Sequence, residues 1–216
     1  MPWMRRLEAT KIRAEARVLH RMILDLLDVR GHDYGRFALE VAAAGGHHLS
    51  LVGPPGVGKT LLAERLPGIL PDLDQAEALE VSAVHSLAGL PLDGGLIRRP
   101  PYADPHHTAS LASIVGGGAR IAQPGAISRA HNGILFLDEA PEFPPRVLEA
   151  LRVPLESGRV VLGRAAAQAT YPASFQLVLA SNPCPCGNAS AVGERAGGGV
   201  AHARRGAHDE RRTARH

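Results

Sequence analysis

The octapeptide GPPGVGKT, from Gly53 to Thr60, has the residue types and the spacing that bind phosphate. Its glycines let backbone N–H groups surround an anion, and a helix that starts directly after it points its positive end at the same anion. Lys59 would then reach the β- and γ-phosphates of a nucleotide, and Thr60 would place its hydroxyl on Mg²⁺. We therefore predict a nucleotide-binding loop made of Gly53, Pro54, Pro55, Gly56, Val57, Gly58, Lys59, Thr60 and Leu61.

The sequence on both sides of the octapeptide favours this interpretation. Strand-like LSLV precedes it and helix-like TLLAERL follows it. This is the context in which the pattern G-x-x-x-x-G-K-[ST] binds nucleotides. The alternative is a glycine-rich turn that merely connects a strand to a helix.

Two carboxylates follow the apolar run of residues 134–137, which fits a strand buried on both faces. They would lie at the C-terminal edge of a sheet, beside the phosphate-binding loop. We predict that Asp138 holds Mg²⁺ through water and that Glu139 polarises the attacking water as the catalytic base. The alternative is that the pair lies at the start of a helix, where acidic residues are also favoured.

A third apolar run, residues 175–180, is followed closely by Asn182. A polar side chain at this strand end would contact the γ-phosphate or orient water, so Asn182 is the second predicted catalytic residue. The three strand ends together predict a site for ATP and Mg²⁺ at one edge of a sheet.

The elements that must position these groups belong to an α/β domain. Strand-like and helical stretches alternate over residues 36–187, which is the pattern of a parallel sheet covered by helices. Residues 157–174 read as a β-hairpin inserted before the third strand. Residues 4–28 carry apolar side chains at helical spacing. Residues 188–216 hold almost no large apolar side chain, so we predict that they are disordered.

The composition fits one globular domain outside the membrane. The chain has 216 residues, of which 45% are hydrophobic and 21% charged, as in ordinary soluble proteins. It contains no apolar run of about 18 residues, and its first residues lack the apolar segment of a secretory signal. We therefore expect a cytoplasmic protein with no membrane partner. The basic residues that give a net charge of +3 are concentrated at the two ends, so this charge says little about nucleic-acid binding.

Cys184 and Cys186 are the only cysteines, and their C-x-C spacing indicates a reducing compartment. They form at most a partial zinc site, because a tetrahedral zinc ion needs four protein ligands. His202 and His208 could supply the two missing zinc ligands, but both lie on the tail that is predicted to be disordered, so zinc is not expected. Six other histidines are expected to pack, cap helices or line a subunit interface rather than to bind metal: His47, His48, His85, His106, His107 and His131.

Several longer motifs narrow the choice among protein families. In order they are LEVAAAGGHHLSLVGPPGVGKTLLAERLPGILP, PHHTASLASIVGGG, QPGAISRAHNGILFLDEAPEF, LEALRVPLESGRVVLGR and YPASFQLVLASNPCPCG. Over about residues 25–187 the sequence resembles the magnesium-chelatase-like AAA+ proteins of the YifB/ComM family. The resemblance implies a P-loop NTPase fold with α/β/α layers, a hexameric ring and ATP hydrolysis. For ComM members it also implies helicase-like branch migration of DNA during natural transformation.

The resemblance also implies residue roles and boundaries. Asn182 resembles the residue called sensor 1, and in such rings the hairpin faces the central pore. Arg159 and Arg164 are therefore candidate DNA contacts, with a solvated hairpin face as the alternative. The resulting division is a helical extension at 1–24, an AAA+ core at 25–187 and a disordered Arg/Gly/Ala-rich tail at 188–216.

The sequence also departs from the family pattern. Family members carry a domain similar to the Lon protease fold, a second cysteine pair, a segment like SGPLLDRID and a helical lid, none of which is recognised here. We expect a truncated copy that lacks the fifth strand and the lid. Hydrolysis by such a chain would be slow, because the neighbouring subunit's arginine is expected in the LLDRID-type segment. The alternatives are a non-catalytic remnant or the ATPase subunit of a magnesium chelatase, and NPCPCG favours the YifB/ComM branch.

Overall fold

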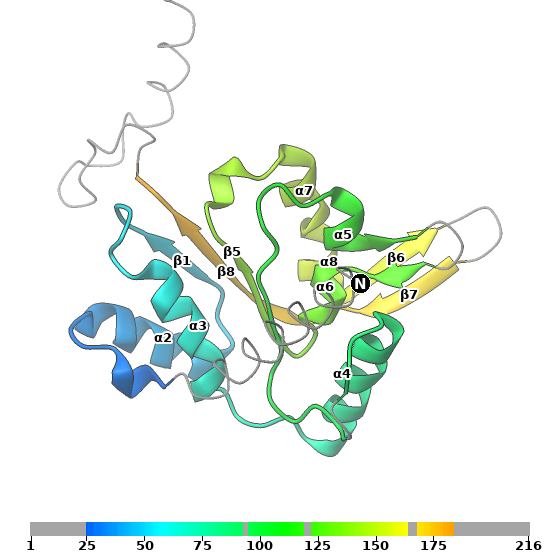
Figure 1. Cartoon of the computed structure of the whole chain (residues 1–216), viewed down its shortest axis with the longest axis horizontal. Coiled ribbons are helices and arrows are strands. Elements are labelled where there is room, and N and C mark those ends of the chain that lie inside the picture. Colours follow the sequence, from blue (N-terminus) through cyan, green and yellow to red (C-terminus); the bar gives the residue numbers. More distant parts are fainter. Residues whose placement is uncertain (1–24, 93–94, 119–121, 164–167, 184–216) are drawn as a thin grey trace, which may run out of the picture.

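The computed structural model describes residues 25–92, 95–118, 122–163 and 168–183. Within these ranges four parallel strands form the central sheet in the order β1-β8-β5-β2 (Figure 1). The strands are β1 (Leu49–Val52), β2 (Tyr102–Ala103), β5 (Gly133–Leu137) and β8 (Phe175–Ser181). Parallel neighbours that are far apart in sequence require crossover connections, and helices provide them.

The middle strands are apolar because both of their faces are covered. Every residue of β5 is buried, and its side chains alternate between two separate cores. Ile134 and Phe136 belong to one core, whereas Leu135 and Leu137 belong to the other. Successive side chains of a strand point to opposite faces of the sheet, so this one apolar run contributes to both cores.

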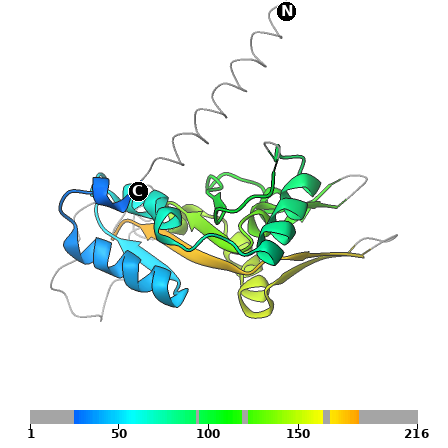
Figure 2. The same cartoon turned by 90° about the horizontal axis from the view of Figure 1, so that it is seen from below.

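One face of the sheet is covered by α2 (Asp33–Gly45) and α3 (Lys59–Ile69), with the short 3₁₀ helix η1 (Leu26–Asp28) beside them. Leu39 of α2 and Leu66 of α3 are fully buried in the same core as Phe136. Figure 2 shows α2 running along the β1 side of the sheet.

The other face is covered by shorter helices. They are α5 (Leu111–Val115), α6 (Ala126–Arg129), η2 (Ala140–Glu142), α7 (Pro145–Ala150) and α8 (Arg152–Ser157). Their buried side chains, among them Ile127 and Val147, pack against Leu135 and Leu177. Helices therefore lie on both faces of the sheet (Figure 1), and the predicted three-layer α/β/α class is confirmed.

Helix α4 (Gln75–Leu87) packs near α6 and begins with a capping box. Asp74 Oδ1 accepts from Glu77 N–H, and Glu77 Oε2 accepts from Asp74 N–H. This reciprocal pair satisfies two amides that the first turn cannot bond itself, which explains why the helix begins there.

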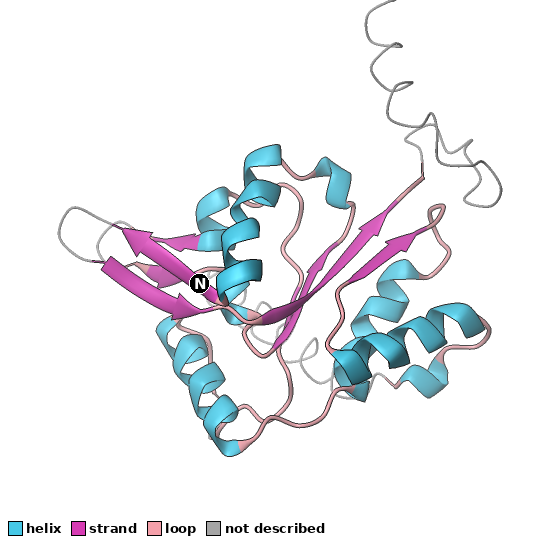
Figure 3. Cartoon of the chain, turned by 180° about the vertical axis from the view of Figure 1, so that it is seen from behind, coloured by secondary structure: helices cyan, strands magenta, loops and turns pink. Residues whose placement is uncertain are grey.

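Two small antiparallel sheets accompany the main one within the described ranges. Strands β3 (Gly116–Gly117) and β4 (Gln123–Pro124) form one, and β6 (Arg159–Gly163) and β7 (Gln168–Pro172) form the other. The β6–β7 pair confirms the hairpin predicted over residues 157–174 and projects from the body of the domain (Figure 3).

Several predictions fall partly or wholly outside the described residues. Of the helix predicted over 4–28, only residues 25–28 are described, and residues 26–28 form η1. The predicted tail lies outside the described ranges. Among the residues that are described, no helix is long and apolar enough to cross a membrane.

Candidate nucleotide-binding site

The candidate site lies where three neighbouring parallel strands end. Strand β8 pairs with β1 on one side and with β5 on the other, so the segments that follow these strands meet at one edge of the sheet. They carry the loop after Val52, the Asp138–Glu139 pair and Asn182. Ligands of open α/β sheets bind at this carboxyl edge.

The loop after β1 adopts backbone conformations that favour glycine. Gly56 has a φ of 79° and Gly58 a φ of 86°, and α3 begins at the next residue, Lys59. The first amides of α3 have no acceptor inside the helix, and they lie at the positive end of its dipole. Gly53 N–H donates to Ser181 O at 3.2 Å, which ties the start of the loop to the end of β8.

Lys59 connects the loop to β8. Its half-buried ammonium donates to Gly53 O at 2.7 Å, to Pro54 O at 3.0 Å and to Asn182 Oδ1 at 3.0 Å. The two predicted residues Lys59 and Asn182, 123 positions apart in sequence, are thus in direct contact. A phosphate group at the loop would meet both of them.

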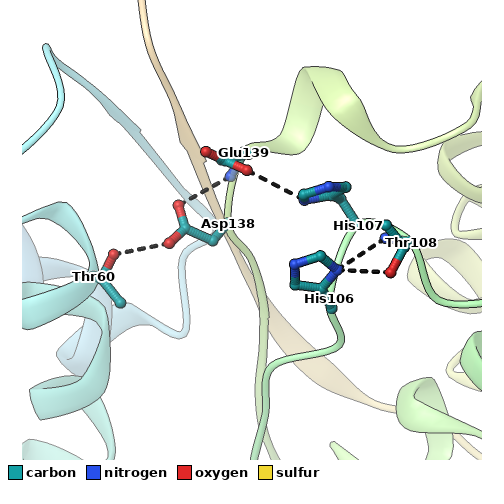
Figure 4. Close-up of polar contacts among 6 residues, drawn as sticks. All are labelled: Thr60, His106, His107, Thr108, Asp138 and Glu139. Atoms are coloured by element: carbon teal, nitrogen blue, oxygen red, sulfur yellow. Dashed lines mark hydrogen bonds and ion pairs between the residues drawn. The ribbon is translucent and has the colours of Figure 1, made fainter.

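Thr60 and Asp138 meet across the edge of the sheet (Figure 4). Thr60 Oγ1 donates to Asp138 Oδ2 at 2.9 Å, while Asp138 Oδ1 accepts from Glu139 N–H at 2.9 Å. A hydroxyl and a carboxylate are oxygen donors of the kind that Mg²⁺ prefers, and Mg²⁺ commonly uses few protein ligands, with substrate phosphates and water as the others. The residues present therefore fit a magnesium ion.

Glu139 has an unusual backbone. It is one of three non-glycine residues in the described ranges with positive φ, at 52°, and it adopts the left-handed conformation. Its side chain is 52% exposed, and Oε2 lies 3.2 Å from Nδ1 of His107. Figure 4 shows His107 contacting Glu139 from the loop after β2, on the side away from Thr60.

Sequence reasoning did not assign His107 to the site. The reason is that β2 has only two residues, too few for a recognisable strand pattern, so nothing in the sequence placed the segment PHHTAS beside β5. The available signal was the pair His106–His107 itself, in a segment that follows an apolar Tyr102–Ala103.

The loop after β1, the two carboxylates after β5 and the end of β8 line one cavity of about 390 Å³, whereas His107 does not line it. Its lining consists of Pro55, Gly56, Gly58, Lys59, Thr60, Leu61, Asp138, Glu139, Ser181 and Asn182. Among these described lining residues Lys59 is the only cation. The cavity therefore combines a cationic, amide-rich end with two carboxylates, which suits a polyphosphate together with a divalent ion.

The remaining predicted site residues lie elsewhere. Arg159 is exposed at the base of the β6–β7 hairpin, where it pairs with Pro172 and lies next to α4. Arg164, Cys184 and Cys186 fall outside the described residues. No group of three or more histidine, cysteine or acidic side chains that would suit a metal ion occurs within the described ranges.

Most of the other histidines that the sequence analysis considered make structural hydrogen bonds. His131 Nε2 contacts Glu80 Oε2 at 3.0 Å, and its Nδ1 accepts from Ser174 N–H. His48 Nδ1 accepts from Leu177 N–H, and His85 Nε2 donates to a carbonyl, Arg129 O. These contacts match the packing roles expected for them.

The fold and the site together define an α/β protein with a glycine-rich loop between a strand and a helix at the carboxyl edge of a parallel sheet. A family model described as magnesium chelatase, subunit ChlI, matches residues 25–205. The chain belongs to this family.

Within the family, the sequence is similar to YifB and ComM proteins. It is 56% identical to YifB of Escherichia coli and 51% identical to the competence protein ComM of Haemophilus influenzae, each over 76% of this chain and 32% of the relative. An uncharacterized protein of Mycobacterium tuberculosis is 62% identical over 75% of this chain and 32% of its own length. The 38 kDa magnesium-chelatase subunit of Rhodobacter capsulatus is only 28% identical, over 61% of this chain.

The chain spans about a third of the length of the YifB and ComM relatives. The similarity therefore concerns one module of those proteins. The identity values favour the YifB/ComM branch over the chelatase subunit, as the sequence motifs predicted.

Solved structures agree on the fold. A structure of the magnesium-chelatase subunits BchI and BchD in complex matches with a TM-score of 0.55 and 26% identity, over 69% of this chain and 52% of that one. NtrX of Brucella abortus in complex with ATP matches with a TM-score of 0.51 and 19% identity, over 85% of this chain and 38% of that one.

Proposed function

We propose that this chain binds ATP with Mg²⁺ at the edge of the sheet and acts as the ATP-hydrolysing module of a YifB/ComM-type motor. The observation that carries the proposal is the meeting of Lys59, Thr60, Asp138 and Asn182 around one cavity of about 390 Å³. These side chains come from three different strand ends, so a plain strand–turn–helix connection does not explain why they converge.

Each group has a chemical task in this proposal. The loop amides and Lys59 hold the β- and γ-phosphates, and Thr60 with Asp138 holds the metal ion. When bound, Mg²⁺ neutralises the charge that develops on the phosphate oxygens during transfer. Asn182, which accepts a hydrogen bond from Lys59, would orient the γ-phosphate or the water.

Glu139 accepts the proton in this scheme. As water attacks the γ-phosphorus, the bond to the bridging oxygen of ADP breaks, and a water proton passes to the Glu139 carboxylate. Half of this side chain is exposed, so water reaches it.

The cavity also indicates what a neighbouring subunit would add. Lys59 is the only cation among its described lining residues, whereas the transferred phosphoryl group carries several negative oxygens. In a ring, an arginine from a neighbouring subunit would supply the missing charge, an effect of roughly 10³–10⁵ in rate where it has been measured. That arginine is expected in the LLDRID-type segment, which is not recognised in this sequence, so we expect turnover by this chain to be slow whether or not its copies assemble.

The proposal is tested by phosphate release from Mg-ATP over a series of protein concentrations, with the variant Glu139→Gln beside the parent chain. The amide is nearly isosteric but accepts no proton, so the variant should lose at least about a hundredfold in rate and keep its nucleotide affinity. If the variant hydrolyses ATP as fast as the parent, Glu139 is not the base.

DNA is the proposed partner of the assembled motor. The support is similarity to ComM, a competence protein, together with the exposed Arg159 on the β6–β7 hairpin. In this proposal Arg159 would contact the phosphate backbone, because an exposed arginine is attracted to phosphate whatever the base sequence. Nucleotide binding does not depend on this second proposal.

A further inference from the structure

Helix α2 carries an apolar row that no described element covers. Tyr34 is 93% exposed, Phe37 65% and Val41 46%, and their spacing of three and four residues puts them on one side of the helix. Leu39, on the other side, is fully buried in the core that α2 shares with α3, so the two sides are distinct (Figure 1). Large apolar side chains gathered in one exposed row, rather than scattered singly, mark an interaction surface.

The exposed side of α2 is also acidic. Its exposed charged residues are Asp33 and Glu40, and none of its exposed residues is basic. Asp33 directly precedes Tyr34 of the apolar row, and Glu40 directly precedes Val41. A partner for this surface should therefore combine an apolar row with positive charge, since complementary charge selects a partner and fixes its orientation.

The sequence of residues 1–24 has both properties. It contains six basic and two acidic side chains, a net charge of +4, with no glycine and a single proline at its second position. An apolar row at helical spacing runs through it: Leu7, Ala14, Val18 and Met22. An arginine directly precedes each member of this row. The sequence thus predicts an amphipathic helix whose apolar row has positive charge along one flank.

The chain enters the described structure beside α2. Asp25 is extended, with φ −109° and ψ 144°, so a helix that precedes it does not continue straight into η1. Leu26 and Val29 then anchor the connection in the core below α2. His32, directly before α2, is left-handed with a φ of 57° and turns the chain again. Two changes of direction within residues 25–32 are what a hairpin of two helices requires.

The lengths of the two segments match as well. Helix α2 has 13 residues, or about 20 Å, and residues 12–24 are equally numerous. The other end of the chain offers no comparable row, because residues 184–216 contain two valines and no leucine, isoleucine, methionine or aromatic residue. The family model matches from residue 25 onward, so the family pattern does not account for residues 1–24.

We propose that residues 1–24 form a helix that folds back onto α2 as an antiparallel hairpin and covers its apolar row. Residues equally far from the connection then face each other, which sets Val18 and Met22 against the apolar row and Arg17 against Glu40. In two antiparallel helices that face each other, side chains one position before the contact rows lie on the same flank, so the arginines meet the carboxylates. None of the described residues that line the nucleotide cavity belongs to α2, so the inference is independent of the proposed function.

Hydrogen exchange of the full 216-residue chain tests the hairpin. In the parent chain the amides of residues 12–24 should exchange at least about tenfold more slowly than in an unstructured peptide, because burying a side chain such as Phe37 shifts a docking equilibrium roughly ten- to hundredfold. Phe37→Asp should abolish this protection while the amides of β5 stay protected. Leu79→Asp is the matched control, because Leu79 is 60% exposed on α4, and it should leave the protection unchanged.

Three results of this experiment would overturn the inference. The first is the absence of protection over residues 12–24 in the parent chain. The second is equal protection in Phe37→Asp, because the segment would then dock elsewhere. The third is protection that increases with protein concentration, because a second copy would then cover α2.

A charge swap tests the arrangement without altering the apolar row. Arg17→Glu and Glu40→Arg should each reduce the protection of residues 12–24 about two- to fivefold, the range expected for one exposed ion pair. The double variant should restore the protection, because opposite charges again face each other. If the double variant is protected no better than the single variants, Arg17 does not face Glu40 and the antiparallel hairpin is wrong.

Discussion

The Asp138 carboxylate accepts two hydrogen bonds, and one of them accounts for the left-handed backbone of Glu139. One of its oxygens accepts from Thr60 and the other from Glu139 N–H. The second bond holds Glu139 in a left-handed conformation that a residue with a Cβ adopts at a cost of about 1–2 kcal/mol. The strained turn directs the Asp138 side chain toward α3 and the Glu139 side chain toward the loop after β2. The two adjacent carboxylates therefore contact different residues, Thr60 and His107.

At the same scale, His85 should make the stability of the domain depend on pH. Burial lowers the pKa of His85 below its ordinary value near 6.5, its hydrogen bond to Arg129 O opposes this shift, and the positive charge of Arg129 adds to it. The folded protein thus binds this proton less readily than the unfolded chain. Its contribution to stability is complete above about pH 6.5 and is lost as the pH falls through the folded-state pKa.

We therefore predict that His85→Gln weakens the acid sensitivity of folding, because the amide still donates to Arg129 O but does not titrate. The measurement is the free energy of unfolding in urea at pH 7.5 and at pH 5.5. The difference between the two values should shrink, by at most about 1.4 kcal/mol per pH unit for one proton. His47→Gln serves as the control, and equal pH dependence in all three chains would contradict the assignment.

Some residue roles were predictable and one was not. Lys59 and Thr60 were predicted because the spacing of their loop follows a backbone geometry that the sequence encodes locally, and Asp138 because it directly follows an apolar run that fits a buried strand. The contact between Lys59 and Asn182 required only that two apolar runs pair as parallel strands. His107 was missed because its place depends on a tertiary pairing of a two-residue strand, for which local sequence carries no period.

At the scale of elements, the junction of β2 and β5 positions the His107 loop. Ile134 N–H donates to Pro101 O at 2.8 Å, and Tyr102 is paired with Ile134. Gly133, at the start of β5, lets the two strands approach. A Cβ added at Gly133 would overlap the carbonyl oxygen of Pro101 and lie 2.6 Å from its Cδ atom.

We predict that Gly133→Ala destabilises the domain by about 1–3 kcal/mol, the usual cost of overpacking where backbone must shift. For a chain of this size the melting temperature should fall by roughly 2–4 °C per kcal/mol. Gly163→Ala is the matched control, because a Cβ there meets nothing within 4 Å, and it should change stability by no more than about 0.5 kcal/mol. Equal melting temperatures for the two variants would show that the β2–β5 junction tolerates the extra methyl group.

The strands themselves were largely predictable. The runs at 49–52, 134–137 and 175–180 correspond to β1, β5 and β8, because short, mainly apolar runs bounded by turn residues fit the buried strands of a parallel sheet. Strand β1 is an edge of the described sheet, and Val52 is 54% exposed. An exposed apolar edge invites pairing with another strand.

At the scale of the whole molecule, the domain is one module of a longer type of protein. Its two cores lie on opposite faces of one sheet, and the proposed site lies at the edge where both layers end. The layers therefore position the loop, the carboxylates and Asn182 relative to one another. The other two thirds or so of the length of the YifB and ComM relatives lies outside the part that this chain matches.

The central claim is that the cavity beside Lys59 binds Mg-ATP, and a calorimetric titration of the 216-residue chain tests it most directly. Lys59→Ala removes the only cation among the described cavity residues and should cost about 2–3 kcal/mol, or roughly a hundredfold in affinity. Lys11→Ala alters the only other lysine and should bind as the parent does. Saturable binding by the parent with a hundredfold loss in Lys59→Ala is the predicted result, whereas equal affinity in the two chains would contradict the account.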